Sequence, residues 1–223
     1  MSINNRILKT VSNIPFNPFD LLQDLKQING LSTNYSLKVR HYTLEKHTLL
    51  VLQEFEKHFN NFSFPISKNL FRIFLSIHDI GKPLALQDGK LSNQHIYSIR
   101  IIDEISEALP LNSEEIKLCK TLILNDPIGL FFQNRITINF ASEIIKNSCK
   151  KTFLNLKNYL RVLTIYYQVD TGSYTMDAGG LPYLEHIFCY ENGNKSYDLK
   201  RELLQFSHNF EQKYRLLEKV LIP

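Results

Sequence analysis

Residues 70–83 read LFRIFLSIHDIGKP, an almost wholly apolar run that ends in a histidine beside an aspartate. With Ser67 as a plausible N-cap, this run predicts a buried helix that ends at Gly81. His78 and Asp79 then lie where an unpaired charge is expensive. A divalent cation would offset that cost best, so the pair are candidate metal ligands.

Two distant residues extend this candidate set. His47 and Asp170 each lie in an amphipathic segment of their own, and imidazole and carboxylate donors together suit a borderline or hard metal. Consecutive helical side chains point about 100° apart, so His78 and Asp79 cannot share a face. Both can still reach a cation off the helix end, with Asp79 as the central ligand. Lys82 would present an ammonium group on the substrate side.

The flanking sequence predicts an all-α protein, because apolar residues recur at three- and four-residue steps and alternating runs are few. The other expected helices run from Asp20 to Gly30, from near Thr43, from His95, up to Leu124, and over residues 140–149, 152–170 and 197–220. Residues 82–93 are expected to form a loop or short hairpin with an Asp88-Gly89 turn, and residues 178–182 and 191–194 two further loops.

Length and composition indicate one globular domain. We expect a helical entry segment over residues 1–35, a core over 36–176 and a helical extension over 177–223 packed on that core. No stretch approaches the ~20 apolar residues of a membrane span, and no secretory leader is evident, so a cytoplasmic location is expected. Three cysteines without CxxC spacing argue against a disulfide framework or a thiolate zinc site. A net charge of +4 is too small to indicate nucleic-acid binding, although it does not exclude it.

Four local patterns carry a resemblance to a known family. They are His47-Thr48-Leu49-Leu50, His78-Asp79-Ile80-Gly81-Lys82-Pro83, Gln94-His95 and Val169-Asp170-Thr171. Together they resemble the HD-domain metal-dependent phosphohydrolase superfamily, and within it the HD region of bacterial tRNA nucleotidyltransferases. The resemblance covers roughly residues 40–174. No Gly-Ser followed by paired acidic residues is present, so the chain looks like an HD domain without the nucleotidyltransferase domain.

This resemblance implies an HD-type helical bundle and a hydrolytic function. His47, His78, Asp79 and Asp170 are expected to hold one divalent cation, which could be Mn, Mg, Co, Ni, Zn or Fe. The cation would activate a water against a small phosphoester of a nucleotide or nucleotide-like compound. Asp79, Lys82 and His95 are the expected catalytic residues.

His95 resembles the third histidine of the superfamily, which helps to hold a second metal or contacts the phosphate. Members with two metals have one more histidine in the next interhelical turn, where this chain has Leu124-Asn125-Asp126-Pro127. Asp126 either replaces that imidazole or the site holds a single metal. We favour the single metal, with Asp126 and His95 as substrate-side or water-orienting groups.

Three more residues are substrate-binding candidates. Arg100 and Arg40 offer guanidinium groups suited to phosphate, although surface arginines are commonly just solvated. Tyr174 lies four residues after Asp170 and could line a pocket for a base.

Other interpretations stay open at this point. A single His-Asp doublet arises by chance, and a buried histidine beside a carboxylate can be a structural hydrogen bond. The fold could also be a catalytically silent nucleotide-binding or regulatory module. A di-iron HD oxygenase is disfavoured by the missing histidine. The sequence leaves the substrate, the metal and the oligomeric state undetermined.

Overall fold

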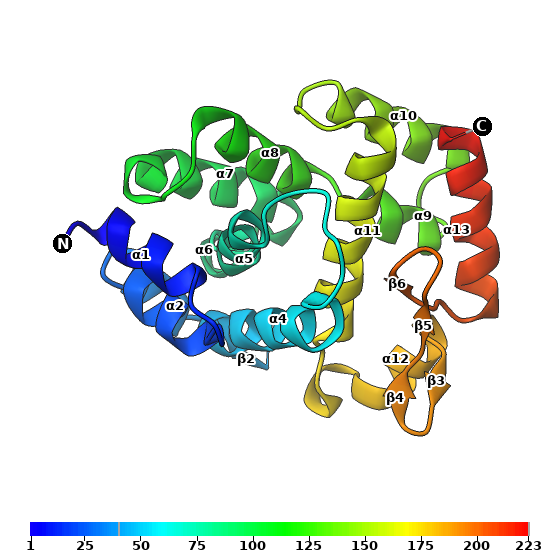
Figure 1. The fold of residues 1–223 in the computed structure, drawn as a ribbon, viewed down its shortest axis with the longest axis horizontal. Coiled ribbons are helices and arrows are strands. Elements are labelled where there is room, and N and C mark those ends of the chain that lie inside the picture. The colour runs from blue at the N-terminus through cyan, green and yellow to red at the C-terminus, as the bar shows by residue number, and fades with distance from the viewer. Residues whose placement is uncertain (40, 223) are drawn as a thin grey trace. The chain divides into compact units, whose positions relative to one another are not determined.

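The computed structural model describes residues 1–39 and 41–222, and helices dominate it (Figure 1). Strands in the described part are two residues long and pair only as antiparallel hairpins. The predicted all-α class is therefore confirmed. Two compact units make up the chain, Met1–Gln53 with Ile66–Leu124, and Glu54–Pro65 with Asn125–Pro223.

The first unit contains the N-terminal helices and the helix that ends at the His-Asp doublet. Its elements are α1 (Ile3–Val11), α2 (Pro18–Leu25), α3 (Leu31–Ser36), β1 (Lys38–Val39), β2 (Tyr42–Thr43), the first part of α4 (Leu44–Phe59), α5 (Lys68–Ile77), α6 (Lys82–Gln87), the 3-10 turn η1 (Leu91–Asn93), α7 (Gln94–Ile105), the 3-10 turn η2 (Ser106–Ala108) and α8 (Ser113–Leu124).

Helix α5 is the core of the first unit, and every residue of 70–77 is buried. The charge in this run, Arg72, is accommodated by the N-terminal segment. Its Nη1 donates to the carbonyl of Val11 at 2.8 Å, and its guanidinium lies 4.1 Å from the ring centroid of Phe16. The hydroxyl of Tyr35 donates to the carbonyl of Ser76 at 2.8 Å, which satisfies an acceptor in the last turn of α5.

The second unit contains the rest of α4 and the C-terminal half of the chain. Its elements are α9 (Pro127–Phe132), α10 (Ile138–Cys149), α11 (Leu156–Gly172), the 3-10 turn η3 (Met176–Ala178), α12 (Gly180–Ile187), β3 (Tyr190–Glu191), β4 (Asn194–Lys195), β5 (Tyr197–Asp198), β6 (Leu203–Leu204) and α13 (His208–Leu221).

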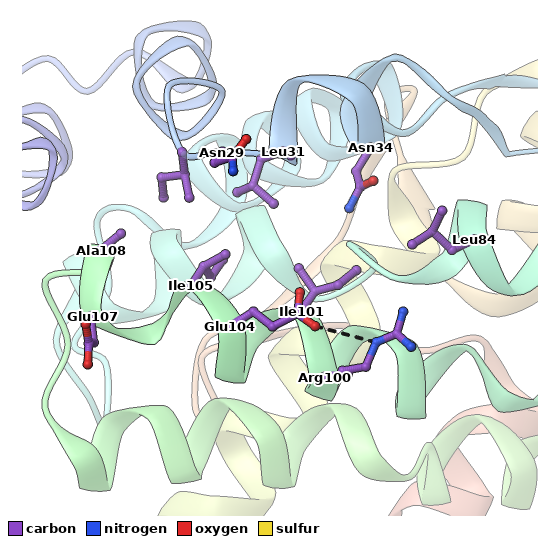
Figure 2. Close-up of a pocket in the computed structure, with 12 residues that line it drawn as sticks. Asn29, Leu31, Asn34, Leu84, Arg100, Ile101, Glu104, Ile105, Glu107 and Ala108 are labelled. Atoms are coloured by element: carbon purple, nitrogen blue, oxygen red, sulfur yellow. Dashed lines mark ion pairs between the residues drawn. The ribbon is translucent and has the colours of Figure 1, made fainter.

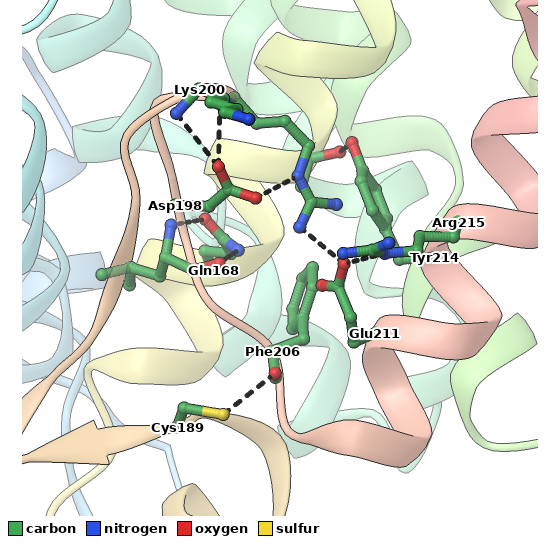
Figure 3. Close-up of polar contacts among 11 residues, drawn as sticks. Gln168, Cys189, Asp198, Lys200, Phe206, Glu211, Tyr214 and Arg215 are labelled. Carbon is green, nitrogen blue, oxygen red and sulfur yellow. Dashed lines mark hydrogen bonds and ion pairs between the residues drawn. The ribbon is translucent and has the colours of Figure 1, made fainter.

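Helix α11 is the core of the second unit, and α9 and α10 pack on it (Figure 1). The side chain of Gln168 is bonded twice to the backbone of Leu204, through its amide at 2.7 Å and its carbonyl at 3.0 Å. This fixes β6 to the helix. Beside it, Asp198 and Glu211 belong to an ion-pair network that joins β5 to α13 (Figure 3).

Three predicted segments were wrong. Residues 82–87 form α6 rather than a loop, since Pro83 suits a first helical turn and Ala85 is fully buried. The Asp88-Gly89 turn ends this helix, with Gly89 at a φ of +66°, instead of closing a hairpin. The predicted helix over residues 197–220 begins only at His208, because the preceding residues pair as β5 and β6. The predicted loop over residues 178–182 includes the start of α12.

Within the described residues, no helix combines the length and the apolar character that a membrane crossing requires.

Candidate metal centre

His78 and Asp79 lie in the turn that joins α5 to α6. Helix α5 ends at Ile77, one turn earlier than predicted, and residues 78–81 form the connection. Gly81 makes this turn possible, because a Cβ on it would lie 2.2 Å from the backbone nitrogen of Ser98 on α7. The backbone N–H of Gly81 donates to the hydroxyl of Ser98 at 3.0 Å. The doublet is therefore held against α7 by a contact that only glycine permits.

The orientation of the His78 ring is set by a backbone hydrogen bond. Its Nδ1 lies 2.7 Å from the carbonyl oxygen of Leu75, which can only accept. Nδ1 therefore carries a proton, and Nε2 is the ring atom that could bind a metal. This Nε2 lies 3.8 Å from Oδ2 of Asp79.

His47 is 2% exposed and lies in the first turn of α4. Its Nε2 is 3.4 Å from Oδ2 of Asp79, and its ring centroid is 5.7 Å from that of His78. The ring of Tyr42, on β2, stacks parallel to His47 with centroids 6.2 Å apart. The two imidazoles and the carboxylate thus converge in the first unit.

Asp79 is the centre of this arrangement. Its Oδ2 also pairs with Nζ of Lys82 at 2.5 Å, and the side chain of Lys82 is only 16% exposed. Burial raises the pKa of Asp79, but the charge of Lys82 and the contacts of His78 and His47 outweigh burial and hold that pKa well below its usual range. Asp79 is therefore an ionised, buried carboxylate, which is a strong ligand for a cation.

Asp170 is the third residue from the end of α11. The hydroxyl of Ser173 donates to its backbone carbonyl at 2.7 Å and closes the last turn of the helix. Together His47, His78, Asp79 and Asp170 form a group whose ligand atoms lie within 4.8 Å of one another, and this group could hold a metal ion. Two imidazoles and two carboxylates are a donor set that fits a divalent cation chemically. The four metal ligands expected from the sequence are thus brought together.

Lys82 was expected at the substrate side, and the structure places it directly on the central ligand. The other candidates are not members of the group. His95 lies half-buried in the first turn of α7. Tyr174 lies half-buried two residues after the end of α11. Arg40 falls outside the described residues. For these residues the substrate roles stay predictions.

Arg100 lies in a different part of the first unit. Its side chain is 62% exposed and its Nε is 3.7 Å from the carboxylate of Glu104. It lines an open groove of about 540 Å³ between the start of α3 and α7 (Figure 2). Leu84 is a further lining residue of this groove, whereas none of the four candidate ligands lines it.

Asp126 has a structural role at the start of α9. Its Oδ1 accepts from the backbone N–H of Gly129 at 2.8 Å, so it is the N-cap of this helix. Burial raises the pKa of Asp126 to about 6, and the charge of Asp170 acts in the same direction. The nearby charge of Asp170 agrees with the predicted role of Asp126 beside the metal group. The N-cap hydrogen bond alone would also account for an aspartate at this position.

The raised pKa of Asp126 predicts a pH-dependent stability. Above pH 6 the carboxyl of Asp126 is ionised in both the folded and the unfolded protein, and burying its charge lowers the stability of the folded protein. This penalty disappears as the pH falls below the pKa that the carboxyl has in the unfolded protein. In metal-free protein, Asp126→Asn keeps the cap and should raise the free energy of unfolding by about 3 kcal/mol at pH 7.5 and by roughly half of that at pH 5. Urea denaturation at both pH values measures this. Asp177→Asn, at an exposed position, is the control, and an equal effect of Asp126→Asn at the two pH values would refute the assignment.

The sequence did not indicate the tyrosine that stacks on His47 or the polar contacts around α11. Tyr42 carries no motif, and its position follows from the hairpin of β1 with β2, in which Val39 pairs with Tyr42. Lys195 contacts the last residue of α11 from 23 positions further along the chain. No local pattern reports a contact of that kind.

Comparison with known proteins adds no family assignment. A scan against protein-family models finds no match for this chain, and searches of curated proteins and of solved structures find no significant match.

Proposed function

We propose that the chain is a metal-dependent phosphohydrolase of the HD type that acts on a phosphoester of a nucleotide or a nucleotide-like compound. One observation carries the proposal, namely the buried group of His47, His78, Asp79 and Asp170 with Lys82 on its central carboxylate. The order of these residues along the chain supports the same reaction class through the resemblance described above.

The four ligands would hold one divalent cation, and their imidazole nitrogens favour Mn, Fe, Co, Ni or Zn over Mg. Such a cation lowers the pKa of a water that it holds and polarises a phosphoryl oxygen. The protein's own residues keep the site ready for it. Leu75 fixes the tautomer of His78 through its carbonyl, and Asp79 stays ionised in a buried position.

Lys82 has the second role in this proposal. Its ammonium neutralises part of the carboxylate charge of Asp79. A cation at Asp79 would compete with this ammonium. Released from Asp79, the ammonium is close enough to meet the negative oxygens of a phosphoester, where its charge would stabilise the transition state. His95 and Asp126 are proposed to act on the substrate side.

The test uses the full chain, stripped with a chelator and reloaded with one cation at a time. We expect about one equivalent of bound metal and metal-dependent release of product from at least one member of a panel of nucleoside monophosphates, cyclic nucleotides and nucleoside triphosphates. Metal content is measured by elemental analysis and hydrolysis by product assay. A protein that binds no metal and hydrolyses none of these compounds would refute the proposal.

The same experiment separates the regulatory alternative. If metal binds and a nucleotide raises the melting temperature without product formation, the chain is a nucleotide-binding module and the hydrolase proposal fails.

A further inference from the structure

A buried ion pair lies in the second unit, between Lys195 on β4 and Glu54 on α4. Their side chains are 8% and 12% exposed. Nζ of Lys195 also donates to the backbone carbonyl of Gly172 at 2.7 Å and lies 5.3 Å from the ring centroid of Phe188. Burying two charges is costly, and such a pair is weak evidence of added stability. Its position suggests another purpose.

The pair connects two helices that carry candidate metal ligands. Glu54 lies seven residues after His47 on α4, which is two turns along nearly the same face. Gly172 lies two residues after Asp170, at the end of α11. Lys195 therefore binds α4 through a side chain and α11 through a terminal carbonyl.

Gly172 leaves the room that this close approach uses. A Cβ on this residue would lie 2.8 Å from Nζ of Lys195 and 2.9 Å from Oε1 of Glu54. Gly172 is a helical residue without a positive φ, so its conformation does not require glycine. The missing side chain leaves the space that the lysine and the carboxylate occupy.

Neighbouring groups keep Glu54 charged and fixed. Nε2 of His58 lies 3.3 Å from Oε1 of Glu54, and the hydroxyl of Tyr197 donates to the backbone carbonyl of His58. Burial alone would raise the pKa of Glu54, but the close contact of His58 and the charge of Lys195 outweigh it and lower that pKa. The carboxylate is therefore ionised at neutral pH and available to Lys195.

We propose that Lys195 and Glu54 form a clamp that positions the candidate ligand Asp170 by fixing the end of α11 against Glu54 on α4. Both are positioning residues, since neither is a member of the ligand group. The inference rests on the proposed metal site and adds that the C-terminal hairpin of β3 and β4 controls its affinity. Without the clamp, the end of α11 can shift relative to Glu54, and Asp170 is no longer held in one position for the cation.

The test compares Lys195→Met, Glu54→Gln and Gly172→Ala with the wild type in the full chain. Lys195→Met and Glu54→Gln should weaken Mn²⁺ binding by about 10-fold, the lower end of the loss caused by removing a direct partner of a ligand, because they act on Asp170 through the backbone of α11. Gly172→Ala should have a smaller effect, because a Cβ there meets only the ends of two flexible side chains. The visible spectrum of the Co²⁺-loaded protein should also change, because it reports the coordination geometry. Titration calorimetry gives the affinity, and urea denaturation of the metal-free protein separates this effect from stability.

Arg201→Met is the matched control. The side chain of Arg201 is 19% exposed and pairs with Asp198 and Glu211 in the same unit, and these partners lie on β5 and α13 and not on α4 or α11. Its loss should lower the free energy of unfolding and leave the Mn²⁺ affinity and the Co²⁺ spectrum unchanged.

The outcomes distinguish the clamp from the metal site itself. If the wild type binds Mn²⁺ and both Lys195→Met and Glu54→Gln bind it equally well, the clamp is refuted and the metal site stands. If the wild type binds no metal, both proposals fall. Should Lys195→Met not fold, Glu54→Gln decides, because it keeps the size of the side chain and removes only the charge.

Discussion

An Asp79→Asn variant is expected to lose bound metal and to hydrolyse phosphoesters at less than about one thousandth of the wild-type rate. The carboxylate is the point on which the site converges, since His47, His78 and Lys82 all approach its Oδ2, at 3.4, 3.8 and 2.5 Å. The amide of asparagine has the same shape but carries no charge, and its oxygen binds a metal ion only weakly. Elemental analysis and equilibrium titration with Mn²⁺ measure the loss of metal.

The fold should survive this change. Lys82 loses its partner, but its side chain is partly exposed and its ammonium can turn toward water. Circular dichroism and thermal denaturation check that the variant is folded. Asp88→Asn is the matched control, since Asp88 is an exposed carboxylate nine residues later that accepts from the hydroxyl of Tyr97 at 2.6 Å. If Asp79→Asn binds Mn²⁺ with wild-type affinity, Asp79 is not a metal ligand.

The buried helix before the doublet could be predicted because its sequence signals agree. Ser67 is the N-cap, and its hydroxyl accepts from the backbone N–H of Asn69 at 3.2 Å. The apolar run that follows is buried throughout. The exception inside it, Arg72, has partners at Val11 and Phe16 that no local pattern in the run could indicate.

The errors arise where local signals are outweighed by tertiary contacts. Pro83 and the Asp88-Gly89 pair are typical of loops, yet burial of Ala85 stabilises a short helix between them. At the C-terminus, residues 197–204 have helix-like spacing, but Tyr197 pairs with Leu204 in a hairpin that Gln168 on α11 holds in place. Such short strands are specified by their partners and not by their own residues.

The candidate ligands were predicted from motif order, and the residues that support them were not. His47, His78, Asp79 and Asp170 each carry a recognisable local pattern. Glu54 and Lys195 are 141 positions apart and lie in an ordinary amphipathic helix and a polar hairpin. Contacts of this kind become visible only once the chain is folded.

A Lys82→Met variant is expected to separate metal binding from catalysis. The ammonium of Lys82 and a bound cation compete for the same oxygen of Asp79, so removing the ammonium should leave the Mn²⁺ affinity unchanged or raise it. The rate of hydrolysis should fall by about 100- to 1,000-fold, because the charge that would stabilise the phosphoryl oxygens is gone. The expected loss lies in kcat, since the interaction strengthens in the transition state.

Titration calorimetry with Mn²⁺ and steady-state kinetics on the phosphoester found in the substrate panel measure the two effects together. Lys90→Met, at an exposed position in the turn after α6, is the control and should change neither. A structural role for Lys82 predicts the opposite pattern, in which the melting temperature falls and kcat of the folded protein is retained. Weaker metal binding in Lys82→Met together with an unchanged kcat would therefore reject the catalytic role, since it would mean that the ammonium only holds Asp79 in place.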